Sequence, residues 1–272
     1  MDNKINLPGV PNARELGGYP AGDRTVRKGI LIRSGALSKA EPEAITILSE
    51  KYHIRYVIDF RMGSVIDGVP DPEVPGADNI RLPVVEIEDF MAKAGNPELV
   101  KIYKSGSIDE RAMFDLEYES GLLSPEMYIL FLFGERGKKA YREFFRILLD
   151  HDPDNGAVLW HCADGKDRAG LAAMLLLYAL GSDIETILED YLITNANNGA
   201  KLEKLRKDSE SFGMPPEKIE ALLFVSGGVF RHYMTHAIDT LETQYGSVNG
   251  YLTKELGLTP ADISLLREKY TV

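Results

Sequence analysis

The stretch "AVLWHCADGKDRAGLAAMLLLYAL" (residues 157–180) decides the fold, because it reads as a buried strand, a short polar loop and an apolar helix in direct succession. The strand is predicted at residues 157–160 and the helix at 168–180. The loop between them holds Cys162, the only cysteine of the chain. Backbone N–H groups at the start of a helix are unpaired and lie at the positive end of the helix dipole. The stretch therefore predicts a site for a tetrahedral anion.

The residues of this loop suit phosphate chemistry. Gly165 allows the backbone to curl so that successive amides converge, from Ala163 and Asp164 to Lys166. Arg168 can bind two phosphate oxygens with its planar fork. The same positive field favours the thiolate of Cys162, which is a nucleophile toward a bound phosphoryl group. The alternative is that the cysteine is merely a small buried residue, but burial does not explain the charged residues at 166–168.

The rest of the chain predicts an α/β domain with a helical C-terminal part. Strands are expected at residues 30–33, 54–60 and 80–85, the last with Pro83 indicating an edge position. An amphipathic helix is expected at residues 41–51. Further helices are expected at 124–150 with a kink near 134–137, and at 183–195, 200–210, 216–223, 229–245, 248–256 and 260–270.

Composition excludes several classes of protein. The formal net charge of −11 argues against nucleic acid and against an anionic membrane as nonspecific partners. A single cysteine excludes an internal disulfide. The N-terminal segment lacks the apolar run of a signal peptide and no stretch is long enough to span a membrane, so we expect a cytoplasmic protein without integral membrane association. His232 and His236 lack a third ligand at metal-binding spacing, and neither metal nor cofactor is expected.

"HCADGKDRAG" (residues 161–170) resembles the phosphate-binding loop, His-Cys-x5-Arg, of the protein tyrosine phosphatase superfamily. The "GKDR" ending is similar to the bacterial tyrosine/lipid phosphatase branch. "NARELGGY" (residues 12–19), "LIRSGALS" (31–38), "VIDFR" (57–61) and "YGSVNGYLTKELGLT" (245–259) also resemble segments of that branch. The resemblance covers most of the chain as a single domain, with residues 86–123 as the exception. It implies a phosphatase fold with a short, largely parallel central sheet flanked by helices.

The resemblance implies roles for individual residues. Cys162 is the expected nucleophile, Arg168 binds phosphate, and His161 helps to favour the thiolate. The general acid is expected at Asp167, inside the loop, with Asp59 as the competing candidate or as a residue that orients Arg168. Lys166 is similar to the extra loop lysine of phosphoinositide phosphatases. Residues 86–123 lie where relatives carry a helical lid.

Two loop residues depart from the family pattern. Ala169 stands where many phosphatases have a Ser or Thr hydroxyl, which predicts slow hydrolysis of the phosphocysteine. Asp164 stands at a position that is usually small or apolar, and its charge opposes anionic substrates unless it is paired or protonated. Outside the loop, we expect Arg33 and Ser34 to brace their strand end. Arg14 is expected either to pair with Glu15 or to face the pocket.

The predicted activity is hydrolysis of phosphotyrosine through a phosphocysteine, with phosphoserine, phosphothreonine and phosphoinositides as further substrates and phosphate as product. Two alternatives remain open. A sulfur or arsenate transferase also has one loop cysteine, but the 166–168 run argues against it. A catalytically weak phosphate-binding module that recognises phosphorylated partners is kept open by Asp164 and Ala169.

Overall fold

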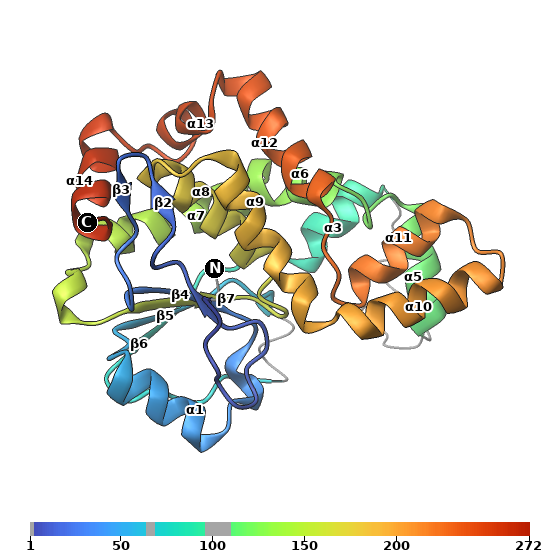
Figure 1. The fold of residues 1–272 in the computed structure, drawn as a ribbon. Helices are drawn as coiled ribbons and strands as arrows, with labels where there is room; N and C mark the ends of the chain where they lie inside the picture. The colour runs from blue at the N-terminus through green and yellow to red at the C-terminus, as the bar shows by residue number, and fades with distance from the viewer. Residues whose placement is uncertain (1–2, 64–68, 96–109) are drawn as a thin grey trace.

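The computed structural model describes residues 3–63, 69–95 and 110–272. A five-stranded sheet with the order β1-β4-β7-β5-β6 lies at its centre (Figure 1). The strands are β1 (Arg14–Glu15), β4 (Leu31–Ser34), β5 (Tyr56–Asp59), β6 (Asp78–Arg81) and β7 (Val158–His161). β1 is antiparallel to β4 and the other neighbours are parallel. A two-stranded sheet joins β2 (Pro20–Ala21) to β3 (Arg24–Thr25).

The strand that leads into the cysteine loop is the middle strand of the sheet. All four residues of β7 are buried, and Leu159 pairs with Ile32 of β4 and Val57 of β5. At the carboxyl edge, His161 aligns with Ser34 and Asp59. Because parallel strands end together at one edge, residues from distant parts of the sequence meet beside Cys162.

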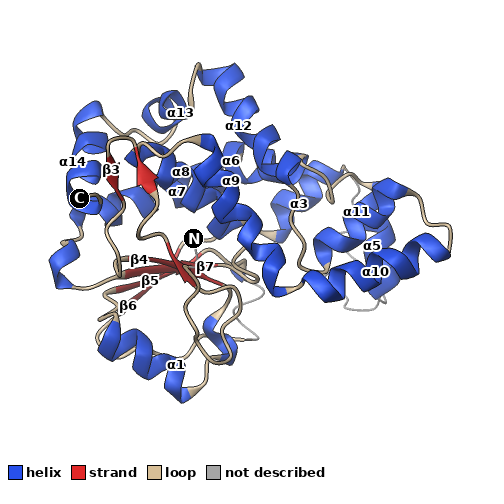
Figure 2. Ribbon diagram, viewed as in Figure 1, coloured by secondary structure: helices blue, strands red, loops and turns tan. Residues whose placement is uncertain are grey.

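Helices cover both faces of the sheet (Figures 1 and 2). Their bounds are α1 (Pro42–Thr46, continued by a π-helical turn at Ile47–Lys51), α3 (Ile87–Ala94), α5 (Glu110–Glu119), α6 (Glu126–Phe133), α7 (Glu135–Asp150), α8 (Arg168–Leu180), α9 (Ile184–Leu192), α10 (Gly199–Ser211), α11 (Pro216–Val225), α12 (Arg231–Tyr245), α13 (Val248–Lys254) and α14 (Pro260–Tyr270). Short 3-10 turns occur at Leu37–Lys39, Pro153–Asn155 and Ile193–Asn197.

Alternate residues of the buried strands enter two separate cores. Val158 and Trp160 face the larger core, which also holds the apolar faces of α6 to α9 and α12 to α14. Leu159 faces the smaller core with Ala44 and Leu48 of the α1 segment. Strands covered on both faces read as continuous apolar runs, which is why their sequences are apolar throughout.

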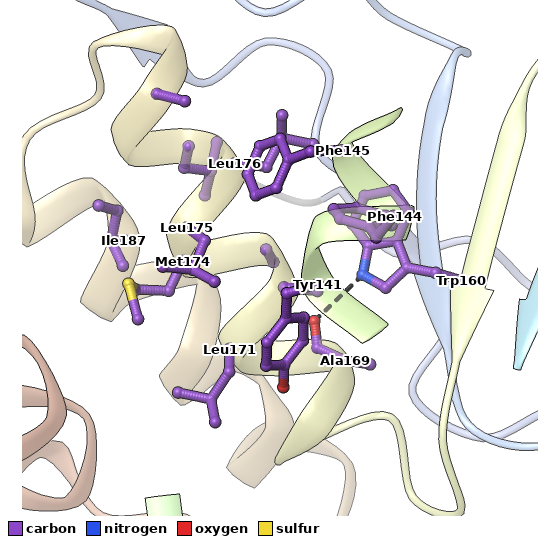
Figure 3. Close-up of a cluster of buried hydrophobic side chains, with 14 of the residues drawn as sticks. Tyr141, Phe144, Phe145, Trp160, Ala169, Leu171, Met174, Leu175, Leu176 and Ile187 are labelled. Carbon is purple, nitrogen blue, oxygen red and sulfur yellow. Dashed lines mark hydrogen bonds between the residues drawn. The ribbon is translucent and has the colours of Figure 1, made fainter. Parts of the chain in front are cut away.

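The close-up in Figure 3 shows how the larger core fixes the start of α8. Trp160 of β7 packs edge-on against Phe144 of α7, with ring centroids 5.4 Å apart. The Trp160 indole N–H donates to the carbonyl of Ala169 at 3.1 Å. The Tyr141 hydroxyl donates to the carbonyl of Arg168 at 3.2 Å. The first turn of α8, and with it the end of the cysteine loop, is therefore held from two sides.

The sequence predicted most elements within a few residues, and α8 at the bounds observed. The single kinked helix predicted at 124–150 is wrong: α6 and α7 are separate helices, because Gly134 adopts an extended conformation between them. The strand predicted at 80–85 lies at Asp78–Arg81 instead, at the edge that Pro83 indicated.

The predicted lid region is described in part. α3 and α5 fall within residues 86–123, whereas residues 96–109 lie outside the described residues. Figure 1 places α5, α10 and α11 together at one end of the molecule, away from the sheet. Among the helices in the described residues, none is both long and apolar enough to cross a membrane.

Candidate active site

The cysteine loop closes tightly against the end of β4. Gly165 has a φ of +69°, in the left-handed region. A Cβ at this position would come within 2.4 Å of the Ser34 carbonyl carbon and oxygen, and within 2.5 Å of the Gly35 nitrogen. Only glycine fits both the conformation and the contact. The predicted need for glycine at this position thus has two physical causes.

The carbonyl groups of the loop all have hydrogen-bond donors. The Ala36 N–H donates to the carbonyl of Ala163 at 2.9 Å. The Asn12 side chain donates to that of Asp164 at 3.1 Å, and Arg33 donates to those of Gly165 and Lys166 at 2.8 and 3.3 Å.

The N–H groups of the loop contrast with its carbonyls. Within residues 3–63, 69–95 and 110–272, no backbone N–H of residues 163–168 donates a hydrogen bond to another group. Unpaired amides beside a helix N-terminus form a cradle for an anion. Cys162, at the base of this loop, is only 1% exposed.

Arg168 stands at the first position of α8, half-buried beside the loop. Its Nη1 lies 3.5 Å from the carbonyl oxygen of Phe60. Its Nε is buried without a hydrogen-bond partner among the described residues. A guanidinium with unused donors suits a ligand that accepts two hydrogen bonds, as a phosphoryl group does.

Asp167 is held by a pair of buried tyrosines. The Tyr128 hydroxyl donates to its Oδ1 at 2.7 Å, and the hydroxyl oxygens of Tyr128 and Tyr191 lie 2.8 Å apart. Oδ2 of Asp167 lies 4.0 Å from the Lys166 ammonium. Burial, followed by the charge of Asp167, raises the pKa of both tyrosines well above the ordinary value. Both hydroxyls therefore stay protonated and able to donate.

Lys166 is directed toward α11. Its ammonium donates to the Phe224 carbonyl, lies 3.5 Å from the Gly228 carbonyl, and sits 4.1 Å from the centroid of the Phe224 ring. The residue is 3% exposed. Its charge is thus largely satisfied by the protein.

Asp59 lies at the end of β5 and is engaged by Arg61. The Arg61 guanidinium contacts both carboxylate oxygens at 2.9 to 3.1 Å. Burial raises the pKa of Asp59, but the hydrogen bonds from Arg61 and the nearby His161 lower it by more, so the net pKa is below the ordinary value. A carboxylate in this state is a poor proton donor. The described residues show no hydrogen bond or ion pair between Asp59 and Arg168.

Asp59 is also part of a compact acidic cluster with Asp71 and His161. His161 Nδ1 lies 3.8 Å from Asp59 Oδ1, and Nε2 lies 3.1 Å from Asp71 Oδ2. The three residues could offer ligand atoms within 4.8 Å of one another. Arg61 already pairs with both carboxylates, reaching Asp71 at 2.6 Å. Arg61 and the two carboxylates thus form an ion-pair network beside His161.

Two cavities meet at the exposed residue Asp164. The smaller, of about 340 Å³, contains Lys166, Asp167 and Arg168 from the loop end of α8. Apart from Asp164 and Glu117, the rest of its lining is apolar and comes from α3, α6, α11 and neighbouring turns, with Glu117 contributed by α5: Met62, Ile87, Phe90, Met91, Leu122, Leu123, Met127, Phe224 and Val225. The larger, of about 620 Å³, is more polar and lies between the N-terminal segment and the start of α10. The loop thus opens into an apolar pocket.

Several contacts near the loop were not identified from the sequence. Arg14 pairs with Asp190 rather than with the expected Glu15, whose carboxylate instead accepts from the Gly29 N–H. Nothing in the sequence marks Tyr128 and Tyr191 as site residues, because they lie in apolar helical patterns. The sequence around Asp190, by contrast, does indicate a buried carboxylate. It follows Ile187 by three positions on the buried face of α9, where a carboxylate needs a partner.

Comparisons with known proteins agree along the chain. A family model described as "Tyrosine phosphatase family" matches residues 5–272. The chain is 29% identical over 269 residues to a protein of Cupriavidus necator named as a tyrosine-protein phosphatase, covering 96% of this chain and 86% of that one. It is 26% identical over 276 residues to the triple specificity protein phosphatase PtpB of Mycobacterium tuberculosis, covering 96% of each chain. A tyrosine-protein phosphatase of Nostoc commune is 31% identical over 152 residues, which is 52% of this chain and 47% of that one.

Proposed function

This chain belongs to the tyrosine phosphatase family and is a phosphoric monoester hydrolase, and on that premise we propose that it hydrolyses phosphotyrosine through a phosphocysteine on Cys162. One observation carries the proposal. The loop carbonyls of residues 163–166 accept hydrogen bonds, while the amides of residues 163–168, beside the buried cysteine and Arg168, have no partner among the residues that the structure describes. Such a site stabilises the charge that develops on a phosphoryl group in transfer.

The proposed reaction has two steps. The thiolate of Cys162 attacks phosphorus and the bond from phosphorus to the phenol oxygen breaks, while Asp167 gives its proton to the leaving oxygen. Water then attacks the phosphocysteine and gives a proton to the Asp167 carboxylate. Inorganic phosphate leaves and the thiolate is restored. Arg168 binds the phosphoryl oxygens throughout, and no external co-reactant besides water is needed.

Asp167 is favoured over Asp59 as the acid. Both oxygens of Asp59 are bound by Arg61, and its lowered pKa makes proton donation unfavourable. Asp167 has one oxygen held by Tyr128 and lines the same pocket as Arg168. We assign Asp59 to the network that orients His161 behind the cysteine.

The pocket beside the loop favours an aromatic leaving group. Its apolar lining, including Met62, Phe90 and Phe224, suits the ring of phosphotyrosine better than the short, polar surroundings of phosphoserine. Phosphoserine, phosphothreonine and phosphoinositides rank behind it. The name of the mycobacterial relative states triple specificity, which keeps these substrates in the proposal. Two features disfavour a polyphosphorylated head group as substrate. The Lys166 ammonium is already bound by a carbonyl of α11, and the exposed Asp164 adds a negative charge at the rim of the pocket.

The test is single-turnover kinetics with p-nitrophenyl phosphate on the wild type, Cys162→Ser and Asp167→Asn. We expect a burst of p-nitrophenol from the wild type, no turnover by Cys162→Ser, and a slowed burst with Asp167→Asn that Asp59→Asn does not reproduce. A burst followed by slow turnover would show that hydrolysis of the phosphocysteine is the slow step. We would ascribe this to Ala169, which offers no hydroxyl to the leaving thiolate. The same residue supports the second candidate, a phosphate-binding module. Phosphate binding without any burst would favour that module.

A further inference from the structure

Two sequence motifs that take no part in the proposed chemistry meet behind the cysteine loop. The segment "NAR" (residues 12–14) leads into β1, and Arg33 lies in β4. Both contact Asp190 of α9 through an arginine side chain: Arg14 at the end of the first segment and Arg33 in β4. These elements are far apart in the sequence, and a single carboxylate joins them.

Asp190 is the centre of a buried ion-pair network. Its Oδ1 accepts from Arg14 Nε at 2.8 Å, and its Oδ2 accepts from Arg33 Nη1. The three side chains are between 0 and 2% exposed. Burial raises the pKa of Asp190, but the charges of the two arginines lower it by more, so the carboxylate is ionised. Burial and the charge of Arg14 lower the pKa of Arg33 to about 10, which leaves it protonated at neutral pH.

Both arginines extend the network to the loop. Arg33 donates from Nη2 to the carbonyls of Gly165 and Lys166. Arg14 donates to the side-chain oxygen of Asn12 at 2.6 Å, and the Asn12 amide donates in turn to the carbonyl of Asp164. Three successive loop carbonyls are thus connected to the Asp190 carboxylate by two hydrogen-bonded routes, one through Arg33 and one through Arg14 and Asn12.

The direction of these carbonyls sets the direction of the amides. In a planar trans peptide, the N–H of each residue points opposite to the carbonyl of the residue before it. The described residues contain no cis peptide. Binding the carbonyls of residues 164–166 on the side of β4 therefore turns the N–H groups of Gly165, Lys166 and Asp167 to the other side. These are three of the amides that the proposed phosphate cradle uses.

We propose that Asp190, acting through Arg33 and through Arg14 and Asn12, is a positioning residue that fixes the amides of the cysteine loop in the orientation that binds phosphate. This inference rests on the proposed function, since it assigns the same loop to phosphate. It gives the network a role beyond stability: the loop is preorganised before any ligand arrives.

Gly170 provides a way to displace Arg33 without changing its charge. A Cβ at Gly170 would lie 2.9 Å from Arg33 Nη2, the atom that binds the loop carbonyls. Gly170 lies inside α8, where alanine is the better helix former. Gly170→Ala therefore keeps every ion-pair partner and forces the guanidinium to shift from the position in which Nη2 reaches the loop carbonyls. Arg33→Lys keeps the charge but loses the fork that reaches Asp190 and the loop together.

The experiment compares Gly170→Ala, Arg33→Lys and Asp190→Asn with Leu266→Ala, a destabilising control in the buried face of α14. Three quantities are measured for each: melting temperature, kcat and KM for p-nitrophenyl phosphate, and the dissociation constant of inorganic phosphate by titration calorimetry. We expect Gly170→Ala and Arg33→Lys to lose about a hundredfold in kcat/KM, the scale of a lost oxyanion donor. Their phosphate affinity falls at least about tenfold, whereas that of Leu266→Ala stays within about twofold while folded.

The outcomes are distinguishable. If Gly170→Ala and Arg33→Lys fold and keep both kcat/KM and phosphate affinity near the wild-type values, the positioning role is wrong. It is also wrong if they lose only melting temperature, as Leu266→Ala does. If the wild type binds phosphate but turns over nothing, the proposed hydrolysis fails, and the phosphate affinities still decide the role of Asp190. A wild type that binds no phosphate would overturn both. Asp190→Asn leaves Arg14 and Arg33 buried without a carboxylate to neutralise them, and this variant is the one that can fail to fold. In that case Gly170→Ala and Arg33→Lys decide whether the positioning role is correct.

Discussion

Replacing Tyr128 with phenylalanine removes the only atom that binds Oδ1 of Asp167 among the described residues, and it leaves the ring in place. Tyr128 is fully buried, and its ring packs against Phe131, Phe224 and Tyr233. Its hydroxyl lies 2.7 Å from Oδ1 of Asp167. The change therefore tests whether this hydrogen bond holds the proposed acid in position, with little effect on packing.

The expected magnitude follows from the type of bond. In the second step Asp167 is a carboxylate, and a hydrogen bond to a charged group contributes about 1.5–3 kcal/mol; in the first step it is a neutral acid, and the bond contributes about 0.5–1.5 kcal/mol. Each 1.4 kcal/mol corresponds to about a factor of ten. If the bond is needed in both steps, Tyr128→Phe lowers the steady-state rate by about 10- to 100-fold and the burst rate by about two- to tenfold. Tyr191→Phe is the matched control, because its hydroxyl contacts that of Tyr128 and not Asp167. The lost bond there is between neutral groups, and we expect about a two- to tenfold loss.

The assay is stopped-flow release of p-nitrophenol at enzyme concentrations that resolve the burst. Melting temperatures of both variants show whether they fold as the wild type does. A folded Tyr128→Phe whose burst and steady-state rates match the wild type would refute the positioning of Asp167 by Tyr128. So would a loss of steady-state rate in Tyr191→Phe equal to or greater than that in Tyr128→Phe.

Three further predictions follow from contacts of the described residues. Gly165→Ala places a Cβ against the backbone of Ser34 and Gly35, so phosphate affinity by calorimetry should fall at least about tenfold, and an affinity equal to the wild type contradicts this. Lys166→Met should change kcat/KM for a phosphotyrosine peptide and for an inositol phosphate by the same factor, since its ammonium is bound by Phe224, and a selective loss on the inositol phosphate would show that Lys166 serves that substrate. Burial, and then the charge of Lys269, lower the pKa of His151 from 6.5 to about 4. As the pH falls from 6.5 to about 4, the imidazole of His151 is therefore protonated in the unfolded chain but not in the folded one. The free energy of unfolding should fall by about 3 kcal/mol over this range. Denaturant unfolding at neutral and acid pH should show that part of the pH dependence missing in His151→Phe, and an unchanged dependence would exclude His151 as its source.

The central strand, the cysteine loop and α8 could be predicted because each is defined by residues adjacent in sequence. Apolar runs at 157–160 and 168–180, with a polar loop between them, allow few alternatives. The tight curl of the backbone at Gly165 was also predicted from the loop sequence, and its φ of +69° agrees with it. These features do not depend on which other segments pack nearby.

The contacts around the loop could not be predicted, because they join segments distant in sequence, from 39 positions between Tyr128 and Asp167 to 176 positions between Arg14 and Asp190. Arg33 meets Asp190 across 157 positions, and Arg14 meets it across 176. A sequence pattern shows that Asp190 lies on a buried face, yet it does not show which cation meets it. The direction of Lys166 was open for the same reason, since α11 supplies the carbonyl that it binds. Tertiary contact, rather than local propensity, decides what each of these side chains does.

Trapping of the covalent intermediate tests the central claim most directly. The chain has one cysteine, so acid quenching during the burst with phosphotyrosine peptide or p-nitrophenyl phosphate, followed by mass spectrometry of the digested protein, examines a single candidate thiol. We predict one phosphoryl group on the peptide that contains Cys162 in the wild type, at a fraction that matches the burst, and none in Cys162→Ser. Turnover without a phosphorylated Cys162 peptide, or turnover by Cys162→Ser at the wild-type rate, would contradict the account.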